Sequence, residues 1–145
     1  MTFKSITKDE LPACAELLMR TYNCPPWNDR WTTESALRYV TEFFCFPRFW
    51  GFATFEGDEL VGAIFCREHT WYTNDELYVD EFFIAPEHQR KGFGVAMLRH
   101  AEDYIKSKGL AGFTLLTNRY MPAPHFYEKN GFTAAEHVIF MYKEV

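Results

Sequence analysis

The sequence predicts a single mixed α/β domain, and three observations lead to that prediction. A chain of 145 residues fits one compact domain better than two. Apolar residues recur at strand-like and then helix-like spacings along the chain. No internal repeat, low-complexity run or Gly/Ser-rich linker divides the sequence. We therefore expect one domain over residues 1–145, with three or four helices and about seven strands.

The first half of the chain predicts a strand, two helices and a hairpin. A short strand over residues 2–6 precedes a helix over residues 11–23, and a second helix begins near Thr32. Residues 49–55 and 59–67 are expected to pair, because a short Gly-containing turn separates two runs rich in β-forming residues. The inner face of the second helix is expected to consist of Ala36, Leu37, Val40 and Phe43.

The second half predicts a strand, a long helix and a smaller closing unit. A strand over residues 76–84 ends at an Ala-Pro pair, and helical spacing follows over residues 93–108. Residues 113–117 suit a further strand, and residues 124–129 suit a short helix closed by Asn-Gly. The apolar and β-branched residues over 133–142 predict one or two final strands.

The charge balance narrows the partners that we expect. Lysine and arginine total 15 against 20 aspartate and glutamate residues, which gives a formal net charge of −5. This balance disfavours nucleic acid and anionic membranes and favours a cationic ligand. No apolar run has the length of a membrane helix or the form of a secretory signal, so the expected location is the cytoplasm. The 15 Phe, 8 Tyr and 4 Trp are expected to line a core or a pocket.

A basic, Gly-containing loop connects the predicted strand 76–84 to the predicted helix 93–108. The start of a helix presents unpaired N–H groups and the positive end of the helix dipole, so this loop suits a phosphate group. Gly92 and Gly94 have no Cβ to keep an anion from the backbone, while Arg90 and Lys91 add positive charge. The two glycines alone are equally compatible with an ordinary strand-to-helix turn.

Two motifs in this half of the chain resemble the GCN5-related N-acetyltransferase (GNAT) family. The pattern QxxGxG at residues 89–94, after a strand that ends Ile-Ala-Pro, is similar to that family's coenzyme A signature. The later APHFYEKNGF at residues 123–132 is similar to the family's closing segment. The two motifs stand in the family's order, and the resemblance extends over nearly the whole chain.

The resemblance implies both a fold and a co-substrate. The fold would be a mixed, mostly antiparallel sheet, splayed between its fourth and fifth strands and flanked by about four helices. The co-substrate would be acetyl-CoA, with its pantetheine arm in the opening of the sheet and its pyrophosphate on the loop amides. The residues implied to bind it are Phe82, Phe83, Ile84, Gln89, Arg90, Lys91, Gly92, Phe93, Gly94, Val95, Ala96, Asn118, Phe126 and Lys129.

The implied reaction is direct transfer of the acetyl group to a primary amine. At pH 7 only about one alkylamine in 10³ is neutral and able to attack a thioester, so the site must manage a proton. Asp80 matches the family position that often carries the base, and Glu81 is the second candidate. Strand alternation places these two side chains on opposite faces. An ordinary Asp pKa near 3.9 favours anchoring of the ammonium and proton transfer through water. The sequence leaves open which carboxylate acts, or whether both form only a solvated acidic strand end.

Tyr127 matches the family's general acid, which protonates the departing thiolate. The oxygen of the reacting carbonyl group would be held by strand N–H groups near Phe83 or Ile84. We expect no metal, because the five histidines lack ligand spacing, and His69 and His88 are expected at the surface.

The acceptor pocket is expected near the loop between the first two helices. Trp27, Asp29, Trp31 and Asp80 are the candidate contacts to the acceptor, because aromatic rings and carboxylates attract cations. The predicted acceptor is therefore a small cationic molecule such as a polyamine or an aminoglycoside-like compound. Two alternatives stay open: a protein lysine or N-terminal acetyltransferase, and an acyl-CoA-binding module that transfers nothing. The sequence also leaves open whether the protein forms a homodimer.

Overall fold

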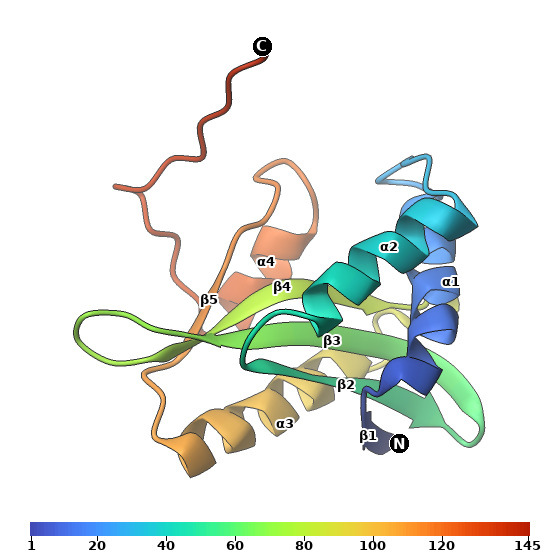
Figure 1. Cartoon of the computed structure of the whole chain (residues 1–145), viewed down its shortest axis with the longest axis horizontal. Coiled ribbons are helices and arrows are strands. Elements are labelled where there is room, and N and C mark those ends of the chain that lie inside the picture. Colours follow the sequence, from blue (N-terminus) through green and yellow to red (C-terminus); the bar gives the residue numbers. More distant parts are fainter.

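Five strands form one sheet in the computed structural model, which describes residues 1–145. The strands lie side by side in chain order (Figure 1). They are β1 (Thr2–Ser5), β2 (Phe49–Glu56), β3 (Glu59–His69), β4 (Glu76–Ile84) and β5 (Phe113–Leu115). All neighbours are antiparallel except β4 and β5, which are parallel. The mixed, mostly antiparallel sheet expected from the sequence is confirmed.

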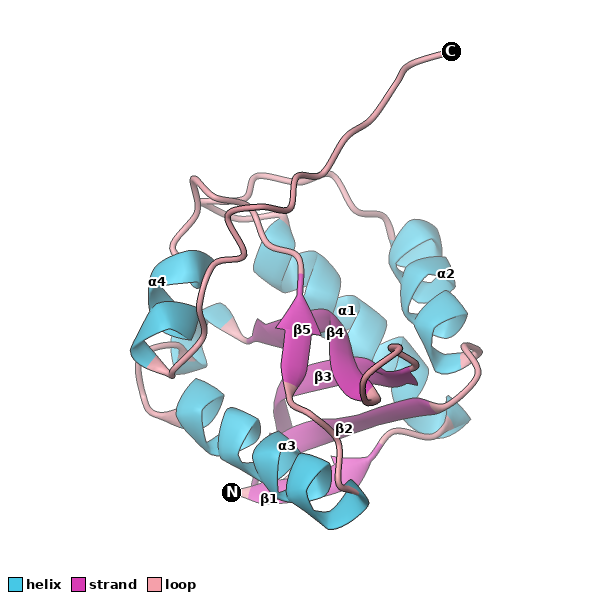
Figure 2. Ribbon diagram, turned by 90° about the vertical axis from the view of Figure 1, so that its left-hand side faces the viewer, coloured by secondary structure: helices cyan, strands magenta, loops and turns pink.

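Four α-helices cover the two faces of this sheet, as expected. They are α1 (Leu11–Tyr22), α2 (Thr33–Phe44), α3 (Phe93–Lys108) and α4 (Ala123–Lys129), with short 3-10 helices η1 (Lys8–Glu10) and η2 (Pro86–His88). Figure 2 shows α1 and α2 on one side of the sheet and α3 on the other. Each face has its own core: Leu18, Val40 and Phe65 are buried under α1 and α2, and Ile64, Leu77 and Met97 are buried under α3. None of these helices combines the length and apolar character needed to span a membrane.

The sheet opens between β4 and β5, at the place that the resemblance implies. Residues 77–79 of β4 pair with residues 113–115 of β5. Beyond Val79, β4 continues to Ile84 along an edge that β5 no longer covers. The backbone groups on that edge are not paired with β5, although the Ile84 carbonyl oxygen accepts from the Gln89 side chain and both backbone groups of Phe82 bond to side chains.

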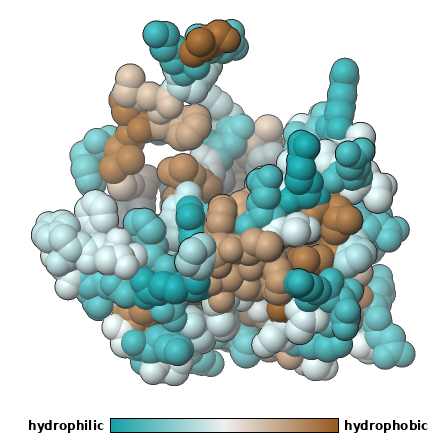
Figure 3. All heavy atoms as spheres, in the orientation of Figure 1, coloured by the Kyte–Doolittle hydropathy of each residue, from teal (hydrophilic) through white to brown (hydrophobic).

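The prediction of about seven strands is wrong, because the sheet has five. Residues 133–142 form no strand, and the apolar side chains from Val138 to Tyr142 are exposed. This segment runs away from the body of the protein (Figure 1) and carries an apolar surface that Figure 3 shows at the upper left. Apolar and β-branched residues suit a pleated surface, but a strand also needs a partner that supplies the other half of its hydrogen bonds.

Two leucines on the first helix pair provide a stability test of this packing. Leu18 of α1 is fully buried, whereas Leu37 of α2, which was expected on the inner face, is 37% exposed. Leu18→Ala is expected to lower the free energy of unfolding by about 3 kcal/mol, since it leaves a cavity in the core. Leu37→Ala is the matched control and should cost less than about 1 kcal/mol. Urea unfolding followed by circular dichroism measures both, and equal losses would contradict the packing described here.

Candidate active site

A β-bulge in β4 brings both candidate carboxylates to the same side of the sheet. Glu81 pairs with Phe65 and Val79 pairs with Cys66, so the residue between them, Asp80, has no partner on β3. The strict alternation expected from the sequence is therefore wrong for this stretch. Asp80 and Glu81 both line one cavity, of about 310 Å³, between the open edge of β4 and the helices α1 and α2. The bulge thus lets two carboxyl groups, instead of one, face a bound molecule.

Glu81 is held between two tyrosines that the sequence analysis did not single out. The Tyr22 hydroxyl donates to Glu81 Oε1 at 2.5 Å, and the Tyr39 hydroxyl donates to Glu81 Oε2 at 2.9 Å. Burial raises the pKa of Glu81, and these two hydrogen bonds oppose that rise. The helical spacing of Tyr39 with Ala36 and Phe43 was a usable signal, because it places Tyr39 on the sheet-facing side of α2. Because both of its carboxylate oxygens accept hydrogen bonds, Glu81 is suited to hold the side chains of Tyr22 and Tyr39 in position at the site.

The environment of Asp80 differs from that of Glu81, and its carboxyl group can change protonation state near neutral pH. Its Oδ2 lies 3.3 Å from Arg67 Nε, and the Arg67 guanidinium packs over the rings of Phe46 and Tyr78. Neither Asp80 Oδ2 nor Arg67 Nε has a well-aligned hydrogen bond. Burial raises the pKa of Asp80 to about 6, against the opposing effect of the Arg67 charge. Asp80 can therefore take up a proton near neutral pH.

Aromatic rings surround these carboxylates. Trp27 packs edge-on against Tyr22 with ring centres 5.2 Å apart, and Trp31 packs against Tyr39 at 4.7 Å. All four rings line the cavity, together with the carboxylate of Asp29. No lysine, arginine or histidine is among the residues that line it, so the cavity combines negative charge with aromatic faces.

Asn23 fixes the loop that carries Trp27, Asp29 and Trp31. The Asn23 side chain accepts from the Trp31 amide and donates to the Trp31 carbonyl oxygen, both at 2.8 Å. The Trp31 indole then donates to Asp29 Oδ2 at 3.0 Å. All four expected acceptor contacts, including Asp80, line one cavity. Residues of this loop line the cavity together with residues of β4 and β5.

Tyr127 reaches the same cavity from the opposite side. It lies on α4, and its ring packs against Phe132 and Phe82 at centre distances of 5.0 and 6.4 Å. Burial raises the pKa of Tyr127, so its hydroxyl keeps its proton at neutral pH. A protonated phenol at this position can donate to a leaving group in the gap between β4 and β5.

The start of α3 has the features of an anion site. No side chain caps its first turn, and the first bond within the helix runs from the Ala96 amide to the Gly92 carbonyl oxygen. The amides of Phe93, Gly94 and Val95 are thus free of intrahelical partners. Gly92 has a φ of +88°, which favours glycine, and this turn directs successive amides toward one point. Arg90 and Lys91, on the exposed preceding turn, add charge.

The side-chain positions of Gly94 and Gln89 also hold the neighbouring elements together. A Cβ at position 94 would lie 3.0 Å from the ring of Phe126 and 3.2 Å from Ile84. Glycine therefore lets α3 and α4 approach the end of β4 closely. The Gln89 side chain donates to the Ile84 carbonyl oxygen at 3.1 Å, which fastens the loop to the strand.

The alternation of the β3–β4 ladder distinguishes the two amides that were candidates for holding the carbonyl oxygen. The Ala85 amide donates to Val61 on β3 at 2.8 Å. Every second residue of an antiparallel strand repeats that direction, so the Phe83 amide also points to β3, whereas the Ile84 amide points to the open edge. The Phe83 side chain is buried beneath α1. Of these two, only Ile84 offers its amide to the gap.

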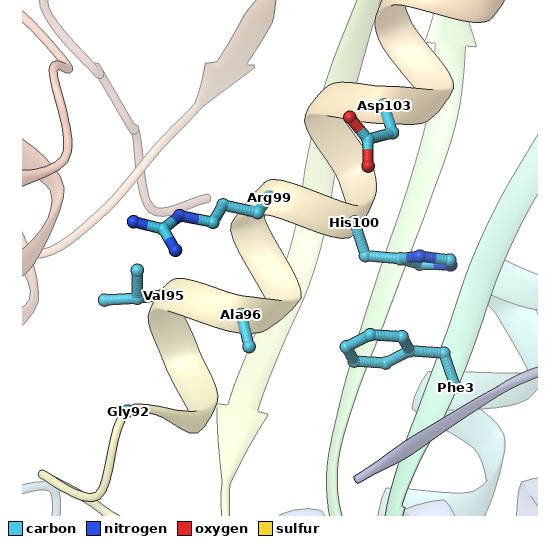
Figure 4. Close-up of a pocket in the computed structure, with 7 residues that line it drawn as sticks. All are labelled: Phe3, Gly92, Val95, Ala96, Arg99, His100 and Asp103. Atoms are coloured by element: carbon cyan, nitrogen blue, oxygen red, sulfur yellow. The ribbon is translucent and has the colours of Figure 1, made fainter.

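The remaining predicted cofactor contacts do not all line the same cavity. Asn118 lines the cavity and turns the chain after β5, where its side chain accepts from the Tyr120 amide at 2.9 Å. Lys129, at the end of α4, is exposed. Val95 and Ala96 line a different, shallower hollow of about 530 Å³ on the outer side of α3 (Figure 4). There His100 stacks on Phe3 with ring centres 4.3 Å apart, and no candidate catalytic side chain is present.

The chain is similar to known proteins in both sequence and fold. Residues 11–132 match the acetyltransferase (GNAT) family. Streptothricin acetyltransferase of Streptomyces lavendulae is 37% identical over 78 residues, which cover 53% of this chain and 40% of that protein. The chain thus matches less than half the length of that relative.

Solved structures show the same fold at low sequence identity. A possible acetyltransferase from Clostridium difficile 630 superposes with a TM-score of 0.82 at 13% identity, over 99% of this chain and 97% of that chain. An aminoglycoside antibiotic 6'-N-acetyltransferase from Acinetobacter haemolyticus gives a TM-score of 0.77 at 17% identity, over 100% and 99% of the two chains. Together with the sequence match over residues 11–132, the bulged β4, the opening beside it and the uncapped start of α3 lead to one conclusion: the chain belongs to the acetyltransferase (GNAT) family.

Proposed function

We propose that the protein transfers an acetyl group from acetyl-CoA directly to a primary amine of a small cationic molecule, of polyamine or aminoglycoside-like type. The observation that carries the proposal is the cavity in which Asp29, Asp80 and Glu81 lie among aromatic rings with no basic side chain. Such a lining attracts a cation and disfavours an anionic acid. The names of the streptothricin and aminoglycoside acetyltransferases support the same class of acceptor.

The residues of the gap fit acetyl-CoA, which supplies the acetyl group as a thioester. The uncapped amides of Phe93, Gly94 and Val95 suit the pyrophosphate, with charge added by Arg90 and Lys91. The open edge of β4 near Ile84 suits the amide groups of the pantetheine arm, which hydrogen-bond in the manner of a β-strand. No metal takes part in this proposal.

The reaction joins the acceptor nitrogen to the acetyl carbonyl carbon, breaks the carbon–sulfur bond and leaves the coenzyme as a thiol. Asp80 binds the acceptor ammonium and accepts its proton, directly or through water, which yields the neutral amine that attacks. The Ile84 amide stabilises the negative charge on the carbonyl oxygen. Tyr127 donates the proton that the departing sulfur takes up, and the second proton that the newly acylated nitrogen loses restores the Tyr127 hydroxyl.

The state of Cys66 supports direct transfer over an acetylated enzyme. Cys66 is fully buried beside Asp80, and burial raises the pKa of its thiol well above the ordinary value. A buried, protonated thiol is a poor nucleophile. Initial-rate kinetics should therefore show a ternary complex and not a ping-pong pattern.

Tyr127→Phe tests the proposed proton donor. We expect kcat to fall by about 10²-fold, at the lower end of the usual range for general acid–base catalysis, because the thiolate can also leave unaided. The dissociation constant for acetyl-CoA should stay within about twofold, since the ring is retained. Thiol release with Ellman's reagent and calorimetric titration measure the two quantities. Unchanged acetylation in Tyr127→Phe would favour the alternative of a binding module that transfers nothing.

A protein lysine or N-terminal acetyltransferase is the second candidate within catalysis. It requires an open groove that accepts an extended peptide on both sides of the reacting amine. Here the loop that carries Trp27, Asp29 and Trp31 lines the cavity and is fixed by Asn23. A panel of peptides tested beside polyamines and aminoglycosides with the same acetyl-CoA assay separates the two candidates.

A further inference from the structure

Residues 138–142 carry five large apolar side chains that all lie in solvent. Their exposed fractions run from 54% at Val138 to 81% at Tyr142, and the whole segment over residues 133–145 is exposed. The five residues, VIFMY, include no glycine, proline or charge, and β-branched and aromatic residues among them suit a strand. A contiguous apolar run of this kind on a folded protein marks a surface that another element covers.

The sheet ends at β5, and the outer edge of β5 has no neighbouring strand (Figure 2). On the inner edge, the Leu77 amide of β4 donates to the Gly112 carbonyl oxygen at 2.9 Å. Backbone groups alternate in direction along a strand, so Thr114 also faces β4, whereas Phe113 and Leu115 offer their N–H and C=O groups to the outer edge. An unpaired edge of this kind is a template for a further strand.

The apolar segment leaves the body of the protein beside this same edge. Phe132 is anchored there, because its amide donates to the Tyr127 carbonyl oxygen at 3.0 Å and its ring stacks on Phe113 with ring centres 5.3 Å apart. A turn follows, in which the Val138 amide donates to the Ala135 carbonyl oxygen at 3.0 Å. After that turn the chain runs away from β5 and from the rest of the molecule (Figure 1). The segment is therefore placed to reach a neighbouring molecule and not its own sheet.

We propose that two copies of this chain exchange these segments, so that residues 138–142 of each copy pair with the outer edge of β5 in the other copy. Within one copy, the apolar segment and the open edge both lack a partner. A two-fold arrangement supplies both partners in both copies and closes on itself, which favours a second copy over an unrelated protein. Strand addition of this kind gains its affinity from backbone hydrogen bonds and from alternate side chains that meet apolar surface.

Apolar surface lies next to the outer edge of β5. Phe113 and Leu115 are partly buried against the core under α3, and the following Leu116 is 60% exposed. Leu115 and Leu116 also line the acidic cavity, so the exchanged strand lies against an element that forms one wall of that cavity. The exchange uses no group assigned to acetyl transfer, and the inference therefore goes beyond the proposed function and does not depend on it.

Light scattering during gel filtration of the full chain tests the exchange. We expect the mass of two chains at micromolar concentration. The double variant Ile139→Asp, Phe140→Asp should raise the dissociation constant of the dimer by at least about tenfold, because adjacent residues of a strand point to opposite faces and one aspartate must then meet apolar surface. Both side chains are exposed within their own copy, so the variant should keep the circular dichroism of a folded protein.

The matched control is Trp71→Asp, Tyr72→Asp, which changes another adjacent pair of exposed apolar side chains, in the loop between β3 and β4. It should dimerise like the wild type. Hydrogen exchange should show protected amides over residues 138–142 in the wild-type dimer and unprotected amides in the Ile139→Asp, Phe140→Asp variant. A monomeric wild type overturns the proposal, and protected amides in that monomer would assign the segment to its own β5. A dimer that persists in this variant also overturns the proposal, because another surface then holds it.

Discussion

Asp80→Asn is expected to lower kcat/KM for the amine by about 10²–10⁴-fold, the usual range for loss of a general base. Asparagine keeps the shape of the side chain but can neither accept the proton nor neutralise the ammonium. The dissociation constant for acetyl-CoA should change by less than about twofold, because the start of α3 and the edge near Ile84 are untouched. Steady-state kinetics with varied amine at saturating acetyl-CoA, together with calorimetric titration of acetyl-CoA, separate the two effects.

The pH profile provides a second readout of the same residue. Burial raises the pKa of Asp80 to about 6, and the carboxylate form is the active one. Activity should therefore be about half-developed at pH 6, fall about tenfold for each unit below it, and approach its full value above pH 7. This acidic limb should be absent in Asp80→Asn and unchanged in the control Asp103→Asn on the outer side of α3. An acidic limb that persists unchanged in Asp80→Asn would assign the base to another group, with Glu81 the first alternative.

Gly94→Val is expected to raise the dissociation constant for acetyl-CoA by about tenfold or more. A Cβ at this position meets the Phe126 ring at 3.0 Å and Ile84 at 3.2 Å, so α4 must move away from β4. Overpacking of this kind typically costs 1–3 kcal/mol, and about 1.4 kcal/mol corresponds to a tenfold loss of affinity. Because Tyr127 follows Phe126 on α4, kcat should fall as well.

The control for Gly94→Val is Asp103→Val, which adds the same side chain to the exposed outer side of α3. It should leave both the affinity for acetyl-CoA and kcat within about twofold of the wild type. The thermal midpoint of each variant shows whether it is folded at the assay temperature. A folded Gly94→Val protein with normal affinity for acetyl-CoA would contradict the packing role given to this glycine.

Local patterns were enough to predict most of the fold. The spacing of apolar residues predicted the four helices, and the strand-to-helix loop with Gly92 predicted an anion site at the start of α3. Both depend on interactions between residues close in sequence, such as the free amides of a first helical turn. The prediction of one or two final strands over residues 133–142 was wrong, because suitability for a sheet does not supply a partner strand for Val138 to Tyr142.

The details of the site depended on contacts between distant residues. The bulge at Asp80 arises from its pairing with β3, and period-two alternation cannot show it. Tyr22 and Tyr39 join Glu81 across 59 and 42 residues of sequence. Gly94 belongs to the signature pattern, yet the structure gives it a packing role that becomes visible only once α4 is in place.

The many aromatic side chains of this sequence lie in two kinds of place, the acidic cavity and the core. Tyr22, Trp27, Trp31 and Tyr39 line the acidic cavity. By contrast, Trp50 stacks on Tyr104 of α3 with ring centres 4.1 Å apart and belongs to the core. Sequence position alone did not separate these groups, because both occur at spacings that suit buried faces.

Acetyl transfer to a small cationic amine is the central claim, and a single assay tests it most directly. The purified protein is incubated with acetyl-CoA and a panel of polyamines, aminoglycosides, amino acids and peptides, and thiol release is followed together with mass spectrometry of the acceptors. We predict amine-dependent thiol release and an N-acetylated polyamine or aminoglycoside-like product, with Asp80→Asn at least about 10²-fold slower on the same acceptor. Binding of acetyl-CoA without thiol release for any acceptor, or acetylation of peptides alone, would contradict the account.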